Sequence, residues 1–423
     1  MAADDVTNDD PPLAPTPVIP RGVWLLLGAK LLITIATLSM TTILGKQVWD
    51  ISHSELDLGF LGLAEFLPTA LLSPITGSIA DRHDRRIVSA IGLAASASVA
   101  FGLWAYAGSD QPRLWPIYCL VAVFGAARAL IAPAIRALPV DLSPRALITR
   151  VVALSSVTWQ IGVIVGPVVA GFLFVASEPA PYLFSAVLLV VAAVTLTFVP
   201  ASEVARLTSA RGLRSALRDA SEGLTFIRRT PVLFGAISLD LFAVLFGGAV
   251  ALLPAIAEER LGVGAIGLGW LRAATGIGAA VVSIALATRP ISRHVGHKLL
   301  TMVALFGAAT LVLGLTRSFA VAFVALLVLS GADAVSVFIR SAIVPLATPD
   351  NMRGRVLATE NVFIGASNEL GAFESGVTGS LFGLVGAIMI GGVGTLAVVG
   401  IWAVFFPKLR KIDRFSELHP AEH

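Results

Sequence analysis

Charged residues are scarce in this chain, and cysteine is almost absent. Only 13% of the 423 residues are Asp, Glu, Lys or Arg, which is about half the share found in water-soluble globular domains. The single cysteine excludes an internal disulfide and a cysteine-ligated metal cluster. The six histidines show no metal-ligand spacing, and no phosphate-binding GxxxxGKS or GxxxxGKT loop occurs. We therefore expect no metal, no cofactor and no direct use of ATP.

Apolar residues are abundant instead. They make up 56% of the chain, so too little polar surface remains to cover a soluble fold, and the outer surface is expected to face lipid. The basic residues are scattered over short loops and form no single patch, which argues against nucleic acid as a partner.

Long apolar stretches alternate with short polar loops along the chain. A bilayer core of about 30 Å requires about 20 apolar residues in a helix, and twelve stretches qualify. The sequence therefore predicts an all-α integral membrane protein with 12 transmembrane helices. They lie near residues 22–46, 57–80, 87–107, 114–135, 150–176, 181–200, 232–256, 265–288, 299–316, 318–340, 356–384 and 386–406.

The Lys and Arg residues of the loops fall almost entirely on one side of this arrangement. The other side holds only Lys46, Arg113, Arg260 and Arg317. Because short loops rich in Lys and Arg stay in the cytoplasm, both termini are predicted to be cytoplasmic. Arg340, at the end of the tenth stretch, is counted as a cytoplasmic anchor.

The longest loop between stretches divides them into six plus six. Such a layout is typical of transporters built from two repeats. The first residues are acidic and rich in proline, so they are predicted to be disordered. The predicted domains are a disordered cytoplasmic tail at 1–21, a six-helix bundle at 22–200, a cytoplasmic linker at 201–231, a second six-helix bundle at 232–406 and a cytoplasmic tail at 407–423.

Within the linker, apolar residues recur at spacings of 4, 3, 4 and 3, namely at Leu213, Leu217, Ala220, Leu224 and Ile227. This periodicity predicts an amphipathic helix that lies on the cytoplasmic membrane surface. A plain linker is the alternative.

The loop after the second stretch reads GSIADRHDRR, from Gly77 to Arg86. It is similar to a loop signature of the major facilitator superfamily, although that signature usually has glycine where this chain has Asp84. In the second half, Arg293 stands at the position of the signature aspartate, so no gating role is expected there. The resemblance implies a conformational role for the loop residues, with simple anchoring of topology as the alternative. These residues are Gly77, Asp81, Arg82, Arg85 and Arg86.

The fifth stretch contains Gly162, Gly166, Pro167 and Gly171. This pattern is similar to the antiporter signature of drug exporters in the same superfamily. Small residues let helices approach closely, and proline kinks a helix. The resemblance implies an exporter, and ordinary packing of small residues is the alternative.

The second half carries longer strings of the same kind, including LDLFAVLFGGAVALLP and GWLRAATGIGA. They resemble a bacterial subgroup of the superfamily that contains enterobactin-type exporters, also called transmembrane secretion effectors. The resemblance implies the major facilitator fold, with two six-helix bundles around a central cavity and alternating access. It also implies a monomer in the bacterial cytoplasmic (inner) membrane.

Several charged residues lie inside the predicted helices, where each costs about 2.5 kcal/mol or more. Asp240 is the first candidate for proton coupling, because a carboxylate withdrawn from water can exchange a proton near neutral pH. A structural pair with Arg272 is the alternative. Asp333 also requires a partner, and Glu369 is a further transport candidate. Arg128 is a candidate because the resemblance places an arginine for proton transfer in its helix.

The eleventh stretch carries small and polar residues at spacings of 4, 3, 4 and 3: Asn361, Gly365, Asn368, Ala372 and Ser375. They share one helical face, which suits a cavity wall or helix packing but not lipid. Asn361, Asn368 and Ser375 are the candidate cavity-lining residues.

Together these features predict a secondary transporter that exports a small amphipathic molecule, such as a drug, siderophore or metabolite, by proton antiport. Its expected partners are this substrate, protons and the lipid bilayer. An importer or uniporter on the same fold is the first alternative. A membrane enzyme and a scaffold that transports nothing are more distant ones.

Overall fold

The computed structural model describes residues 18–109, 111–201 and 213–420. Regular structure in these ranges consists of helices, without a strand, because a chain in lipid must satisfy its backbone hydrogen bonds within each segment. Eleven of the described helices are long and apolar enough to cross a membrane. The predicted disordered tail at 1–21 lies mostly outside the described residues, and the domain boundaries stay predictions.

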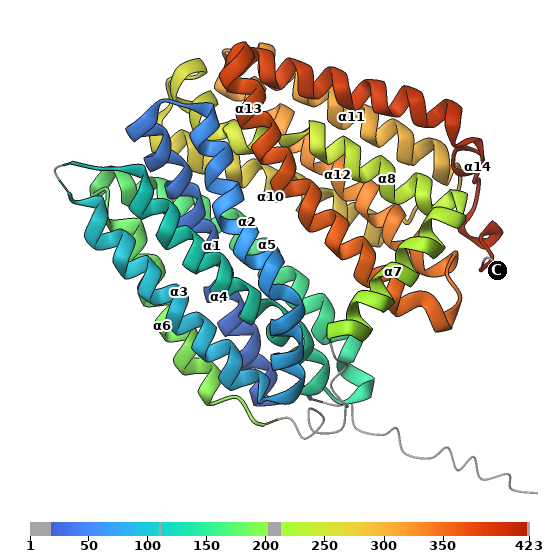
Figure 1. The fold of residues 1–423 in the computed structure, drawn as a ribbon, viewed down its shortest axis with the longest axis horizontal. Coiled ribbons are helices and arrows are strands. Elements are labelled where there is room, and N and C mark those ends of the chain that lie inside the picture. Colours follow the sequence, from blue (N-terminus) through green and yellow to red (C-terminus); the bar gives the residue numbers. More distant parts are fainter. Residues whose placement is uncertain (1–17, 110, 202–212, 421–423) are drawn as a thin grey trace, which may run out of the picture.

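The first half of the chain forms six long helices that pack around one another. Helix α1 packs on α5 and α6, α3 packs on α4 and α6, and α2 packs on α4. In Figure 1 they form the blue to green group on one side of the molecule. Their bounds are α1 Arg21–Ser52, α2 Glu55–Arg82, α3 Arg85–Ala107, α4 Leu114–Asp141, α5 Ile148–Ala176 and α6 Ala180–Thr197.

The second half forms a similar group beside the first (Figure 1). Helix α10 packs on α12, α11 packs on α12 and α13, and α8 packs on α13. The two halves meet where α2 packs on α13 and α5 on α10. The bounds of the long helices are α8 Pro231–Phe246, α10 Gly264–Thr288, α11 Val295–Leu315, α12 Phe319–Leu346 and α13 Asp350–Phe405.

Helix α13 contains two membrane spans in one continuous helical run of 56 residues. At about 1.5 Å per residue it is more than twice as long as a bilayer core is thick. Gly383 breaks it with a φ of 73°, a conformation that glycine adopts without steric cost, and Figure 1 shows the sharp bend. Counting α13 twice gives the predicted twelve spans, with the division at the predicted place.

The seventh predicted stretch, 232–256, lies within one helical span, Pro231–Arg260, but the type of helix changes along it. Helix α8 ends at Phe246, and Gly248–Leu252 form a 3-10 turn. A side chain at Gly247 would collide with Phe306 of α11, and one at Gly248 with the backbone of Gly371 in α13. Paired glycines therefore let an interrupted helix lie close to its neighbours.

Helix α7, Leu213–Arg229, contains the predicted amphipathic segment. The side chains of Leu213, Leu217 and Ala220 lie outside the described residues. At its other end, Phe226 and Ile227 are buried in a cluster with residues of α8, α12 and α13. This end of α7 therefore packs on protein and not on the membrane surface that the sequence suggested.

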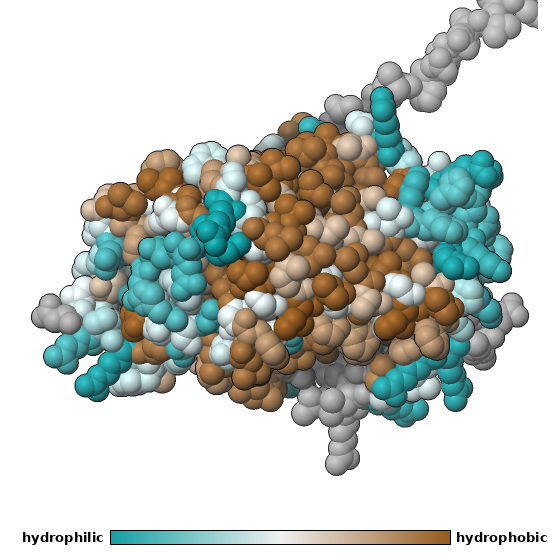
Figure 2. Space-filling view, turned by 90° about the horizontal axis from the view of Figure 1, so that it is seen from above, coloured by the Kyte–Doolittle hydropathy of each residue, from teal (hydrophilic) through white to brown (hydrophobic). Residues whose placement is uncertain are grey.

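Each span reverses the direction of the chain, so the helix ends fall on two faces. We call the face that holds the start of α1 and the end of α13 the terminal face, and the other the opposite face. Figure 2 shows a broad hydrophobic area on one side of the molecule, with hydrophilic side chains gathered toward its ends. This distribution matches a protein that is surrounded by lipid.

The C-terminal segment docks on the start of α11 at the terminal face. The amides of Val295 and Gly296 donate to the carbonyls of Asp413 and Ile412, at 3.2 and 3.0 Å. The carboxylate of Asp413 accepts from the amide of His294 at 2.9 Å and from Arg293 at 3.2 Å. These donors lower the pKa of Asp413. The carboxylate of Asp413 thus lies beside the loop in which Arg293 occupies the position of the signature aspartate.

Candidate functional site

The two halves touch each other mainly through small residues near the opposite face. A side chain at Gly376 of α13 would lie 2.7 Å from the carbonyl oxygen of Glu55 and 2.8 Å from Cα of Gly59, both in α2. Lys46 of α1 forms an ion pair with Asp50 and another, at 3.1 Å, with Glu258 of the second half. These contacts join the two halves at the opposite face.

The glycine–proline motif of α5 contributes to both the bundle and the junction. A side chain at Gly166 would lie 2.8 Å from the carbonyl oxygen of Ile35 in α1, and one at Gly162 would meet Thr34 of α1 at 2.5 Å. Gly171 lies against the carbonyl of Ala265, 2.5 Å from where its Cβ would be. The carbonyl oxygen of Pro167 lies 2.5 Å from the Cβ position of Gly269 in α10, so the motif fixes how closely α5 approaches helices of both halves.

The loop motif lies at the terminal face, where α2 ends and α3 begins. Arg85 pairs with Asp141 at the end of α4 at 2.5 Å, and Arg86 donates to the carbonyl of Val199. Arg82 is exposed, and the side chain of Asp81 lies outside the described residues. Gly77 has nothing within 4 Å of its Cβ position, so it makes no close helix contact at this helix end.

Asp84 is the residue at which this loop departs from the signature that it resembles. It is the N-cap of α3, and its carboxylate accepts from the amide of Arg86 at 2.9 Å. It also pairs with the Arg86 guanidinium at 2.6 Å. These bonds lower the pKa of Asp84 and stabilise the start of the helix.

A cavity of about 400 Å³ lies among the helices of the second half, at the interrupted segment after α8. Its apolar wall includes Val250, Phe306 and Leu329. The size and the mixed lining are typical of sites for small molecules. The polar side chains of the wall are Arg272, Thr275, Ser330, Asp333, Asn368 and Glu369.

The polar stripe on α13 passes from an open to a closed environment. Asn361 and Asn368 are exposed, and nothing lies within 4 Å of the Cβ position of Gly365. Ser375 is only 4% exposed and packs against Gly248. Asn368 thus lines the cavity, Asn361 lies nearer the terminal face, and Ser375 takes part in helix packing instead of lining the cavity.

Asp240 of α8 forms a buried ion pair with Arg340 of α12. The distance is 2.7 Å, and the two side chains are 7% and 4% exposed. The sequence offered Arg272 as an example of a partner for Asp240, and it counted Arg340 as a cytoplasmic anchor. The structure differs on both points, because Arg340 lies inside α12 and pairs with Asp240, whereas Arg272 lines the cavity.

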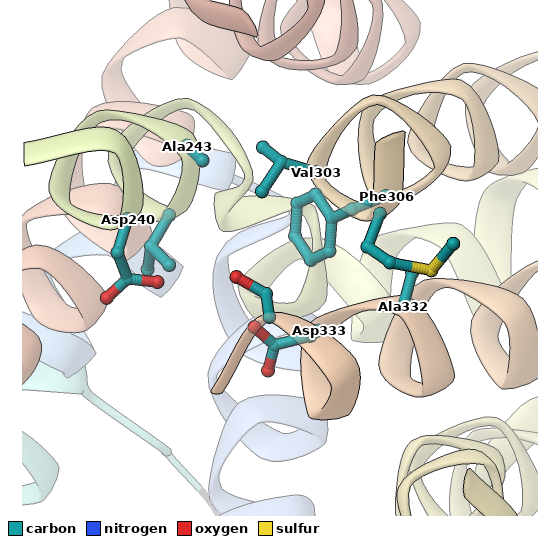
Figure 3. A pocket seen from close by; sticks show the side chains of 9 residues that line it. Asp240, Ala243, Val303, Phe306, Ala332 and Asp333 are labelled. Atoms are coloured by element: carbon teal, nitrogen blue, oxygen red, sulfur yellow. The ribbon is translucent and has the colours of Figure 1, made fainter. Parts of the chain in front are cut away.

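Asp333 lies between this pair and the cavity. It lines the cavity, and together with Asp240 it lines a space of about 10 Å³ that is closed by Val303 and Phe306 of α11. Figure 3 shows Asp240 and Asp333 entering this space from different helices. Glu360 of α13 is 7% exposed and interacts electrostatically with the Asp240–Arg340 pair. Three neighbouring carboxyl groups, those of Asp240, Asp333 and Glu360, therefore interact with Arg340.

A second charged cluster joins the halves. Arg128 of α4 pairs with Glu65 of α2 and interacts electrostatically with Glu369 of α13. An oxygen of Glu369 reaches to 3.4 Å from the Cβ position of Gly62 in α2. Glu369 thus lines the cavity and also approaches the first half.

Sequence reasoning missed three parts of this site. Thr275 and Ser330 were overlooked because isolated hydroxyl residues in apolar helices carry no pattern. Glu65 is a further charge inside a predicted helix, but its partner on α4 is 63 residues away in the sequence. The pair Gly247-Gly248 indicates the helix break after α8. The uninterrupted apolar character of this stretch favoured a continuous helix instead.

Comparisons with known proteins agree with this architecture. The family model of the Major Facilitator Superfamily matches residues 24–339. The uncharacterized MFS-type transporter YfiS of Bacillus subtilis (strain 168) is 25% identical over 70% of this chain and 69% of its own length. Enterobactin exporter EntS of Escherichia coli O1:K1 / APEC is 24% identical over 82% of each chain.

Among solved structures, a bacterial homolog to the human lysosomal transporter Spinster, in an inward-facing and unoccupied conformation, has a similar fold. The TM-score is 0.71 at 14% identity, and the match covers 96% of this chain and 100% of that one. This likeness confirms the fold class predicted from the sequence.

Proposed function

Because the chain belongs to the major facilitator superfamily and is a multi-pass membrane transporter, we propose that it exports a small amphipathic molecule in exchange for protons. The exporter signature in α5 supports the direction, as does the similarity to a protein named as an enterobactin exporter. The apolar lining of the cavity supports an amphipathic substrate.

We place the terminal face in the cytoplasm of a bacterium. Nearly all basic loop residues lie at that face, and such loops stay on the cytoplasmic side. The described conformation is then closed to the outside, and the stripe from Asn361 to Asn368 leads from the cytoplasm to the cavity. A substrate would enter by this route and leave after the halves rock to the other state.

The observation that carries proton coupling is the excess of acid around Arg340. Asp240, Asp333 and Glu360 surround the single guanidinium of Arg340. A second and third carboxylate in this low-dielectric region would repel the first, so the cluster holds at least one proton.

Asp333 links this cluster to the substrate. The space between Asp240 and Asp333 has room for about one water molecule, which would relay a proton between the two carboxyl groups. Asp333 and Glu369 line the cavity beside the substrate, and Glu369 is balanced by Arg128. Proton release to the cytoplasm would then accompany substrate binding.

The test is proton flux in proteoliposomes that enclose a pH-sensitive dye. The wild type is challenged with a panel of amphipathic drugs and siderophores, beside Asp333→Asn, Asp240→Asn and the control Glu374→Gln. Glu374 lies in the same helix as Glu369, but its carboxylate accepts from Thr378 at 2.7 Å. Asp333→Asn is the sharper variant, because Asp240→Asn leaves Arg340 buried without its partner.

We expect a substrate-dependent pH change in the wild type and the control, and its loss in Asp333→Asn with substrate binding retained. Substrate flux without any pH change would contradict proton coupling and favour a uniporter. Accumulation of the substrate together with protons, rather than in exchange for them, would favour an importer.

A further inference from the structure

Arg272 differs from the other arginines inside the spans. Arg128 contacts Glu65 and Arg340 contacts Asp240. Within the described ranges, Arg272 has no acidic partner within ion-pair distance, and its Nε, like that of Arg340, is buried without a hydrogen-bond partner. A guanidinium withdrawn from water in this way is costly, so its place in the spans calls for a partner that the protein does not supply.

The surroundings of Arg272 leave room for such a partner. Its side chain forms part of the wall of the 400 Å³ cavity. One terminal nitrogen reaches toward α1, where a methyl group on Gly45 would lie 3.6 Å away. The guanidinium thus lines a cavity of the second half and also approaches α1 of the first half.

The acidic residues of the same cavity are engaged elsewhere. Asp333 interacts with Asp240 and Arg340, and Glu369 interacts with Arg128. Arg272 interacts electrostatically with neither. The cavity therefore offers one free cationic corner beside an apolar wall, with hydroxyl groups from Thr275 and Ser330 nearby.

From this geometry we infer that Arg272 is the binding residue for an anionic group on the substrate, which is an amphipathic monoanion such as an aryl carboxylate. The guanidinium presents paired N–H donors that match a carboxylate. The apolar body of the ligand lies against Val250, Phe306 and Leu329. The inference deepens the proposed function, because it names the chemical class that this cavity takes.

The experiment measures equilibrium binding to the purified full chain in nanodiscs, without a pH gradient. The probes are 1-naphthylacetate, 1-naphthylacetamide and 1-naphthylethylamine, which share an apolar body and differ in charge. The variants are Arg272→Gln, Arg272→Lys and the control Lys30→Gln. Lys30 is another cation inside a span, but it does not line the cavity.

We expect the wild type to bind the carboxylate about tenfold or more tightly than the amide, as a charge-assisted hydrogen bond provides. Arg272→Gln should abolish this preference, Arg272→Lys should retain part of it, and Lys30→Gln should leave it unchanged. Equal binding of carboxylate and amide, a preference that survives in Arg272→Gln, an equal loss in Lys30→Gln or no binding of any probe would overturn the inference.

This test separates the two proposals. An anion preference that depends on Arg272, in a protein without proton flux, would overturn proton coupling alone. Proton-coupled export of neutral compounds, without any preference for the carboxylate, would overturn the anion site alone.

Discussion

The charged side chains within the spans differ chiefly in what lies next to them. Arg340 is buried with Asp240, whereas Arg272 faces the cavity. Breaking a buried pair from one side leaves an uncompensated charge, while removing an unpaired charge leaves none. Neutralising Arg340 should therefore destabilise the fold, whereas neutralising Arg272 on the neighbouring helix α10 should cost much less stability.

Replacement of Arg340 by methionine should destabilise the protein by about 3–5 kcal/mol, because Asp240 would remain buried without a partner. The double variant Asp240→Asn/Arg340→Met should recover most of this loss, and Arg272→Met should cost much less than Arg340→Met. Thermal unfolding of the detergent-solubilised protein measures all three. Equal losses for Arg340→Met and Arg272→Met would show that the pair is not a structural element.

Among the helices, glycines determine how closely the halves approach. Gly376 of α13 meets the backbone of α2, and Gly171 of α5 meets the backbone of α10. Backbone atoms cannot move aside as side chains can, so even a methyl group at these positions must separate two helices. These contacts exist only while the opposite face is closed.

Gly376→Ala should therefore shift the protein away from the described conformation. A cysteine at Asn368, in a Cys119→Ser background, would report this as a severalfold slower reaction with a maleimide added at the terminal face. Gly400→Ala is the matched control, since Gly400 is in the same helix with nothing within 4 Å of its Cβ position. An unchanged rate in Gly376→Ala would mean that this contact does not govern the equilibrium.

In the whole molecule, the two halves are joined at the opposite face, and the cavity lies among the helices of the second half. Lys46, Asp50 and Glu258 add an ionic link between the halves to the glycine contacts. The side chain of Lys46 is 8% exposed and that of Glu258 is 42% exposed. Water weakens such a link but does not abolish it, which suits a contact that must break in each cycle.

Lys46→Gln should weaken this link by about 1 kcal/mol and raise the population that is open at the opposite face about fivefold. Spin labels at Glu178 and Arg317, exposed residues of opposite halves, should show a larger fraction of long distances. Arg113→Gln removes a charge from the same face, outside this link, and should leave the distances unchanged. A similar change in both variants would attribute the effect to net charge and not to the link.

Much of the fold could be predicted from the sequence because lipid imposes a simple rule on each segment. About 20 apolar residues must form a helix, and the placement of basic residues sets its direction. These are local properties, and twelve stretches with alternating loops follow from them. The end of the eleventh stretch near Gly383 and the close packing at Gly166 could also be predicted. Both depend on the missing side chain of glycine, which is a property of the residue itself.

The pairing of charges is a different kind of property, and only the tertiary structure decided it. For a structural role of Asp240, the sequence offered Arg272 on the next helix as an example of a partner. The angle at which α8, α10 and α12 cross places Arg340 beside Asp240 and turns Arg272 into the cavity. The sequence by itself thus determined which charged residues lie in the membrane spans. It did not determine their partners, because these depend on how helices that are distant in the chain pack together.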